Sequence, residues 1–350
     1  MFDIKQILRD NIKRLVPYAS ARDEFSGTAH IFLDANENSL GSPIVPAYNR
    51  YPDPHQLKIK EQLKSIKGLP PQNIFLGNGS DECIDLLYRA FCNPGKDNVI
   101  INPPTYGMYE VSAHINDVEV RRAMLTADFE LDLEAIEERV DENTKIIWIC
   151  SPNNPTGNAF NRAGIETILN NFDGLVVIDE AYVNFSRQQS FIRELTDYSN
   201  LVILQTLSKA WGLAGLRMGM AFAGKPIVDI LNHIKLPYNI CQATQDLVSV
   251  ALQGTYQVNE MIKDIVYMRD ELAEKISRLS GIIKVYPSDA NFLLVQIKNA
   301  KQVYKSLIAN GIVVRDRSSA PGCGDCLRIT VGTKEENDKL LITFSEIGIM

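Results

Sequence analysis

The sequence predicts an α/β protein with a large, mainly parallel, doubly wound sheet domain and a smaller α+β domain. Through the middle of the chain, short runs that are apolar on both faces alternate with helical segments, as expected for parallel strands covered by helices. After about Gly254 the pattern changes to a long helical stretch and then a strand-rich region. The length of 350 residues, 45% of them hydrophobic, is enough for about two domains.

The first residues, 1–14, show helix-like spacing and are followed by a turn-rich stretch at 34–54. Apolar spacing then predicts a helix from Leu57 to about Gly68, a short strand at 73–76, and a helix with Ser80 or Asp81 as its N-cap. The strands of the large sheet are expected at residues 99–101, 145–150, 175–178, 201–205 and 218–223.

In the C-terminal part, residues 261–279 predict a long helix, and 291–297 and 327–331 are the clearest strands. We therefore divide the chain into an N-terminal arm (1–35), a large domain (36–250) and a small domain (251–350). The arm is expected to pack with the small domain.

The composition argues against nucleic acid or an anionic membrane as partner, because 36 Lys and Arg face 43 Asp and Glu, a formal charge of -7. A small anionic ligand needs only a few local cations and stays possible. The N-terminus lacks the pattern of a signal peptide, and no apolar run is long enough for a membrane span. We expect a cytoplasmic protein.

The six cysteines are scattered, and only Cys323 and Cys326 have the spacing of a metal or redox pair. A zinc site would need a second pair, and the four histidines are far apart in the sequence. We therefore predict no metal and a reducing compartment.

Polar motifs follow three of the predicted strands at their carboxyl ends. Asn153-Asn154-Pro155-Thr156-Gly157 follows one strand, Asp179 ends the next, and Ser208-Lys209 follows a third. Ligands of open α/β sheets bind outside the carboxyl ends of the strands, so we expect these motifs to meet at one site.

Lys209 lies in a segment of small and apolar residues, which disfavours the usual reading of a solvated surface lysine. Its amine could form an imine with an aldehyde. Asp179 emerges from a buried strand, where a carboxylate needs a partner such as a protonated pyridine nitrogen. The alternatives for Asp179 are a helix N-cap or a metal ligand, with only the adjacent Glu180 as a second acid.

The remaining candidates could contact the other parts of one bound ligand. Gly79-Ser80-Asp81 opens a helix and offers backbone N–H groups to a phosphate, with Ser208 and Arg217 as further donors. Asn154 and Tyr182 are candidates for contact with a ring oxygen. Tyr106 could cover a flat ring, although core packing is equally compatible with its position. Together these residues fit pyridoxal phosphate.

The chain resembles the fold-type I pyridoxal-phosphate-dependent aminotransferases and, within the class II subgroup, the histidinol-phosphate aminotransferase family. The resemblance covers nearly the whole length. The motifs at Asn153–Gly157, Asp179–Tyr182 and Lys209 mark the superfamily. The narrower family is indicated by Pro17-Tyr18-Ala19-Ser20-Ala21-Arg22, Asp34-Ala35-Asn36-Glu37-Asn38 and Pro103-Pro104-Thr105-Tyr106-Gly107-Met108-Tyr109.

The resemblance implies a role for each matching position. Lys209 would hold pyridoxal 5'-phosphate as an imine and shuttle a proton, Asp179 would face the pyridine nitrogen, and Asn154 and Tyr182 the ring oxygen. The cofactor phosphate would be bound by Ser80, Asp81, Ser208 and Arg217, and by Tyr51 of a second subunit in a homodimer with shared sites. Substrate contacts are expected from Tyr18, Asn36, Arg315 and Arg328. Arg328 could alternatively form a salt bridge that closes a strand, and Arg317 could be confused with Arg315.

The implied reaction is amino transfer between L-histidinol phosphate and 2-oxoglutarate, a step of histidine biosynthesis. The alternatives within the fold are an aromatic amino-acid aminotransferase and a phosphothreonine-type decarboxylase. A regulatory protein that retains the fold is the alternative outside enzymes.

Overall fold

The structure is a computed structural model, which describes residues 2–18 and 30–349. Within these residues, a seven-stranded sheet has the order β1-β7-β6-β5-β4-β2-β3, and β7 alone runs antiparallel to its neighbours. The mainly parallel sheet was predicted. Its strands are β1 (Ile74–Asn78), β2 (Asn98–Ile101), β3 (Glu119–Arg122), β4 (Thr144–Cys150), β5 (Leu175–Asp179), β6 (Leu201–Thr206) and β7 (Met218–Ala223).

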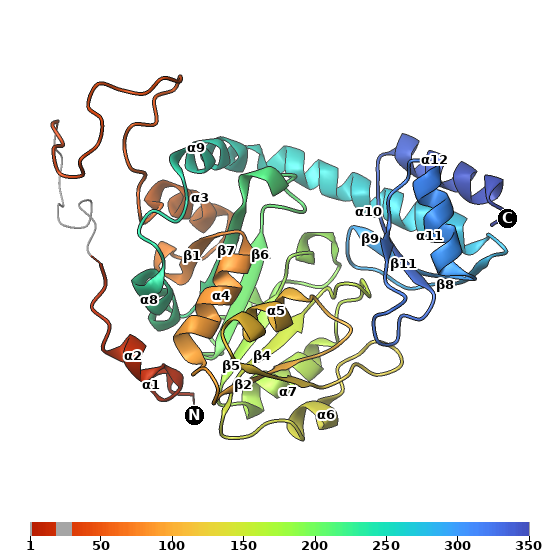
Figure 1. The fold of residues 1–350 in the computed structure, drawn as a ribbon, viewed down its shortest axis with the longest axis horizontal. Helices are drawn as coiled ribbons and strands as arrows, with labels where there is room; N and C mark the ends of the chain where they lie inside the picture. The colour runs from red at the N-terminus through yellow and green to blue at the C-terminus, as the bar shows by residue number, and fades with distance from the viewer. Residues whose placement is uncertain (1, 19–29, 350) are drawn as a thin grey trace.

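Helices cover both faces of this sheet, as the doubly apolar strands require (Figure 1). Successive strand residues alternate between two cores: Val176 and Ile178 face one, Leu175 and Val177 the other. The first core is covered by α3 (Leu57–Lys67), α6 (Leu133–Glu137), α7 (Arg162–Asn171) and α9 (Gln242–Ala251). The second is covered by α4 (Ser80–Phe91), α5 (Met108–Ile115) and α8 (Lys225–Ile234).

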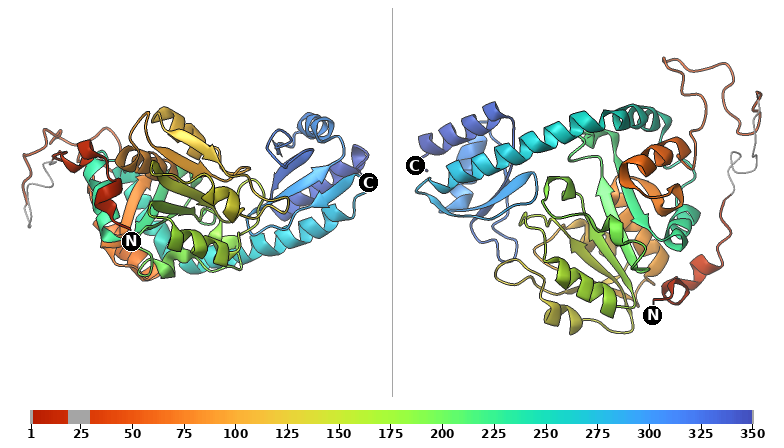
Figure 2. Two further views of the ribbon diagram at one scale, coloured as in Figure 1. Left: turned by 90° about the horizontal axis from the view of Figure 1, so that it is seen from below. Right: turned by 180° about the vertical axis from the view of Figure 1, so that it is seen from behind.

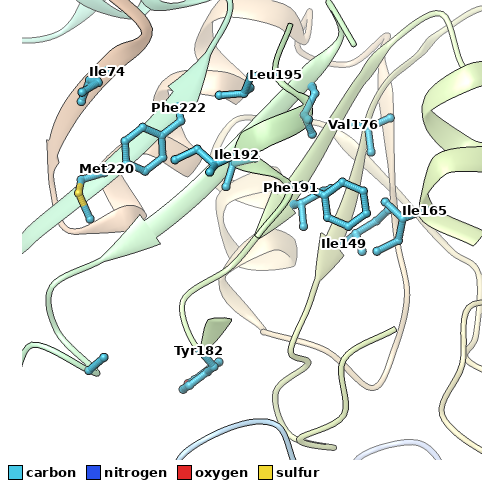
Figure 3. Close-up of a cluster of buried hydrophobic side chains, with 14 of the residues drawn as sticks. Ile74, Ile149, Ile165, Val176, Tyr182, Phe191, Ile192, Leu195, Met220 and Phe222 are labelled. Atoms are coloured by element: carbon cyan, nitrogen blue, oxygen red, sulfur yellow. The ribbon is translucent and has the colours of Figure 1, made fainter. Parts of the chain in front are cut away.

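Figure 3 shows part of the first core, with its side chains along the strands of the large sheet. Val176, Met220, Phe222 and Tyr182 all belong to this cluster, and in this view Tyr182 lies apart from the other labelled side chains. Short 3-10 helices occur at Pro71–Asn73, Val183–Phe185, Phe191–Glu194, Ala214–Leu216 and Leu252–Gly254.

A second, four-stranded antiparallel sheet has the order β10-β11-β9-β8. It consists of β8 (Ile282–Val285), β9 (Phe292–Ile297), β10 (Arg315–Asp316) and β11 (Cys326–Thr330). One face is covered by α10 (Thr255–Ser277), α11 (Ala300–Ala309) and α12 (Lys334–Glu346). The small α+β unit therefore has its own core, as the strand-rich C-terminal pattern indicates.

The long helix α10 connects the two units (Figures 1 and 2). Its Val258 packs into the large-sheet core, whereas Leu272 and Ile276 pack into the core of the small sheet. The two sheets lie on either side of the predicted boundary at residue 250, but α10 contributes to both cores. The boundary itself stays a prediction.

The start of the N-terminal arm, residues 2–15, packs on the large unit, so our expectation that the arm contacts the small domain was wrong for these residues. Its helices α1 (Ile4–Ile7) and α2 (Asp10–Lys13) place Phe2, Ile4 and Ile7 against the core beneath α4 and α8. The Arg9 amide donates to the Ala90 carbonyl at 3.1 Å. The apolar spacing predicted a helical face but could not show which surface that face would cover.

Candidate active site

The carboxyl ends of β4, β5 and β6 bring the predicted motifs together. These strands are neighbours, and β1 runs in the same direction while β7 starts at the same edge. One pocket there is lined by Ser80, Asp81, Tyr106, Cys150, Asn154, Asp179, Ala181, Tyr182, Thr206, Ser208, Lys209 and Arg217. The sheet topology thus brings residues from six separate segments of the chain into one pocket.

Asp179 is the most buried acid of the pocket, at 3% exposure. The Tyr109 hydroxyl donates to its Oδ2 at 2.7 Å, and the Ala181 N–H donates to Oδ1 at 3.1 Å. Burial raises the pKa of Asp179 to about 6, while these two hydrogen bonds act in the opposite direction. Because the carboxylate is costly to bury, it is poised for a cationic partner such as a pyridinium N–H.

Glu180, the possible second metal ligand, points to the other side of β5, as strand alternation requires. Its carboxylate accepts hydrogen bonds from the Phe191 N–H, at 2.7 Å, and from the Gln205 side chain, at 2.9 Å. Among the described residues no group of three or more His, Cys, Asp or Glu is arranged to hold a metal ion. Asp179 and Glu180 therefore do not form a metal site together.

Lys209 follows β6, and its Nζ lies 5.7 Å from the centroid of the Tyr182 ring. Burial is the main cause that lowers its pKa, and the positive charge of Arg328 acts in the same direction. Both effects increase the fraction of neutral amine, which is the nucleophilic and basic form of a lysine side chain. Lys209 as a residue is exposed at the open pocket, but the partial burial of its amine and the nearby positive charge favour the reactive neutral form.

The start of α4 has the features of a helix end that could bind an anion. Gly79 occupies the N-cap position with φ +76°, one residue before the Ser80 or Asp81 that we expected, and no side chain caps the helix. The first N–H groups of α4 are thus not satisfied by a capping side chain, which suits an anion. Gly219, in β7, allows the start of α4 to lie close to this strand. A Cβ at residue 219 would lie 2.2 Å from the Ser80 nitrogen.

Around this helix end, polar side chains orient one another. The Asp81 carboxylate accepts from the Tyr106 hydroxyl at 3.0 Å and lies 3.6 Å from an Nη of Arg217. These two contacts position Tyr106 and Arg217. The negative charge of the Asp81 carboxylate would repel a phosphate, so the predicted phosphate contact of Asp81 is left to its backbone N–H group. The Ser208 hydroxyl lies 3.0 Å from Oγ1 of Thr206, a pocket residue that we did not predict.

Asn154 and Arg328 connect the large and small units. An Nη of Arg328 donates to the Asn154 Oδ1 at 2.5 Å, and its guanidinium lies 5.2 Å from the Phe292 ring centroid. Since Oδ1 is occupied, the amide N–H group of Asn154 is the part available for a ligand. Arg328 makes no salt bridge among the described residues, so the alternative of a strand-closing ion pair does not apply to them.

Besides Arg328, four predicted site residues do not line this pocket in the single chain. Tyr18 is 76% exposed, and Asn36 and Tyr51 line a separate groove with Tyr238. The Tyr51 ring stacks on Tyr238 with centroids 4.4 Å apart. Residues 19–22 of the motif that begins at Pro17 lie outside the described residues. Arg315 is exposed on β10, opposite Arg328.

Tyr109, like Thr206, is a residue beside the site that the sequence interpretation missed. It belongs to a quoted motif, and its position three residues after Tyr106 is the signal that could have placed it near the site. The two rings meet edge to face, with centroids 5.5 Å apart. Burial raises the pKa of Tyr109 well above its ordinary value, so its hydroxyl remains a proton donor to Asp179.

The comparisons with known proteins agree with this geometry. A profile of the aminotransferase class I and II family matches residues 37–344. The chain therefore belongs to the class I and II aminotransferases. A curated histidinol-phosphate aminotransferase from Parabacteroides distasonis is 52% identical over 97% of this chain and 98% of its own length.

Two solved structures share the fold. The histidinol-phosphate aminotransferase of Clostridium acetobutylicum has a TM-score of 0.79 and 25% identity, over 86% of this chain and 91% of the other. The enzyme of that name from Sinorhizobium meliloti, solved in complex with pyridoxal-5'-phosphate, has a TM-score of 0.78 and 23% identity, over 85% and 82% of the two chains.

Proposed function

We propose that this protein transfers an amino group between L-histidinol phosphate and 2-oxoglutarate with pyridoxal 5'-phosphate as cofactor. In the biosynthetic direction, glutamate and imidazole-acetol phosphate are consumed, a step of histidine biosynthesis. The observation that carries the proposal is the convergence of Lys209, Asp179 and the open N-terminus of α4 on one pocket. The roughly 52% identity to a histidinol-phosphate aminotransferase favours the same substrate.

The pocket residues fit this cofactor at each of its polar groups. The buried Asp179 suits the pyridine nitrogen, the amide N–H of Asn154 suits the ring oxygen, and Ser80, Ser208 and Arg217 surround the place for the phosphate. The pyridinium ring supplies an electron sink when it is bound. Tyr106, held by Asp81, is placed to cover a ring face.

The protein's own groups then supply binding and proton transfer. Lys209, with its lowered pKa, acts as the general base and acid that moves a proton at its Nζ. Asp179 keeps the opposite side of the pocket negative, which stabilises a bound cation. Arg328, joined to Asn154, presents its guanidinium beside the site for a substrate carboxylate or phosphate.

We also infer a homodimer in which the groove of Asn36 and Tyr51 serves the active site of the second subunit. Leu40 is 96% and Val45 is 99% exposed in the segment between the groove residues Asn36 and Tyr48, and a partner that covers these apolar side chains would remove them from water. A second copy would also explain why Tyr51 lies outside the pocket of its own chain.

No helix among the described residues could cross a membrane. The cytoplasm remains the location that we propose for the protein.

An amino-transfer assay with histidinol phosphate and 2-oxoglutarate, followed by glutamate formation, tests the proposed function. Phenylalanine and phosphothreonine are assayed in parallel. We expect the highest kcat/KM for histidinol phosphate. Faster transfer from phenylalanine, or release of carbon dioxide from phosphothreonine, would assign the protein to one of the alternatives within the fold, and the absence of all three reactions would favour the regulatory alternative.

A further inference from the structure

The small sheet has one face covered by helices and one face turned toward the large unit. Leu293, Val295 and Leu327 belong to the core beneath α10, α11 and α12. Strand alternation turns their neighbours Phe292, Leu294 and Arg328 to the opposite face. Phe292 contacts Tyr182 edge to face, with ring centroids 5.2 Å apart, so this face looks onto the active site.

Three arginines share this face. Arg315 pairs directly with Arg328 across the β10–β11 ladder. The Arg317 N–H donates to the Cys326 carbonyl at 2.9 Å, which continues the ladder beyond β10. Because Arg317 is two residues from Arg315, and Cys326 is two from Arg328, strand alternation places Arg317 on the same face.

The positive charge of this cluster is not neutralised within the described part of the chain. None of Arg315, Arg317 and Arg328 forms an ion pair with a carboxylate there. The Nε of Arg317 is buried and has no hydrogen-bond partner. Burial lowers the pKa of Arg317, and the charges of Arg328 and Arg315 lower it further. Such an arrangement is costly for the protein alone and is relieved by an anion.

We propose that Arg317 binds the phosphate group of the amino donor, as a third cation beside Arg315 and Arg328. This inference rests on the proposed function. A phosphate monoester carries about two negative charges near neutral pH and three acceptor oxygens, whereas a carboxylate carries one charge. A third guanidinium therefore adds more to the binding of a phosphorylated substrate than to that of glutamate, and makes Arg317 a determinant of specificity.

The test compares L-histidinol phosphate with unphosphorylated L-histidinol in the protein and in Arg317→Gln. Loss of one charge-assisted hydrogen bond is expected to lower kcat/KM for the phosphorylated substrate roughly 10- to 100-fold. The values for L-histidinol and glutamate are expected to change less than about threefold. Arg317→Lys, which keeps the charge, is expected to recover part of the loss, and inorganic phosphate should inhibit the Gln variant more weakly.

Arg278→Gln is the matched control, because Arg278 is an exposed arginine of the same unit whose side chain pairs with Glu274. It is expected to leave the preference between the two substrates unchanged. If Arg317→Gln lowers kcat/KM equally for both substrates, or lowers it for neither, the assignment of Arg317 is overturned. Failure of the unaltered protein to use histidinol phosphate would instead refute the proposed function, whatever the variant does.

Discussion

The strand-end cluster of the large sheet and the arginine-bearing face of the small sheet differ in how completely their polar groups are paired. In the first, the buried Asp179 accepts hydrogen bonds from Tyr109 and Ala181. In the second, Arg315 is exposed and the Nε of Arg317 has no partner. The comparison indicates that the cofactor end is organised by the protein itself, whereas the substrate end is completed by the charge of its ligand.

The two regions meet where the turn after β4 contacts the loop before β9. The Asp289 N–H donates to the Gly157 carbonyl at 2.7 Å, and the Asp289 side chain accepts from the Ala159 N–H at 3.2 Å. These contacts bring Phe292 and Arg328 over the pocket. A substitution in the first region should therefore affect the chemistry, and one in the second the choice of substrate.

The largest effect is expected at Lys209. A substitution there should affect the chemistry, which we assign to the first region. Lys209→Ala removes the amine that attaches the cofactor and moves the proton, so kcat should fall by about 10⁴-fold or more. The protein should bind the cofactor loosely but lose the absorption band of the covalent linkage. Lys305→Ala, which removes an exposed lysine on α11, is the control. A Lys209→Ala protein with the band intact would refute the assignment.

A smaller effect is expected at Arg328, on the border between the regions. Arg328→Gln loses the guanidinium that contacts Asn154 and should lower kcat/KM roughly 10- to 100-fold for every substrate that has a carboxylate or phosphate. The absorption of the bound cofactor should change little. Steady-state kinetics measure kcat/KM, and an absorption spectrum of the protein shows the state of the bound cofactor. Release of the cofactor from this variant would show that Arg328 serves the first region instead.

The pH dependence of stability tests whether the first region is built for a cation. In the cofactor-free protein, the raised pKa of Asp179 makes the folded state bind a proton more tightly than the unfolded state does. The resulting contribution to folding stability is fully present below pH 3.8 and is lost as the pH rises through about 6. Between pH 5 and 7, Asp179→Asn should therefore gain stability relative to the unaltered protein, by on the order of 2 kcal/mol. Denaturant unfolding measures this difference, and saturation with cofactor should reverse its sign.

The sequence predicted the first region better than the second because parallel strands of one sheet have their carboxyl ends at the same edge. Buried parallel strands such as β4, β5 and β6 are recognisable from uninterrupted apolar runs, and their carboxyl ends share one edge. The predicted positions of Asn154, Asp179 and Lys209 in one pocket follow from this. The pairing of Tyr109 with Asp179 depends on how α5 packs, which no pattern in the sequence encodes.

The second region was harder because two of its strands are short. β10 has two residues, both charged, and β8 has four, so neither was predicted, whereas the longer β9 and β11 were. The partner of the N-terminal arm was also missed, since Ile4 and Ile7 define an apolar face without identifying its contact surface. Register between strands, which sets Arg315 opposite Arg328, is visible only in the structure.

The smallest effect is expected at Tyr109, a positioning residue for Asp179. Tyr109→Phe removes a hydrogen bond that lowers the pKa of the carboxyl, so that pKa should rise further and kcat should fall by about three- to tenfold. The pH at which the absorption of the bound cofactor titrates measures the shift. Tyr88→Phe is the matched control, because Tyr88 donates to the Tyr109 carbonyl in the same core but does not contact Asp179. If both variants shift the titration equally, core packing and not the hydroxyl at 109 sets the charge of Asp179.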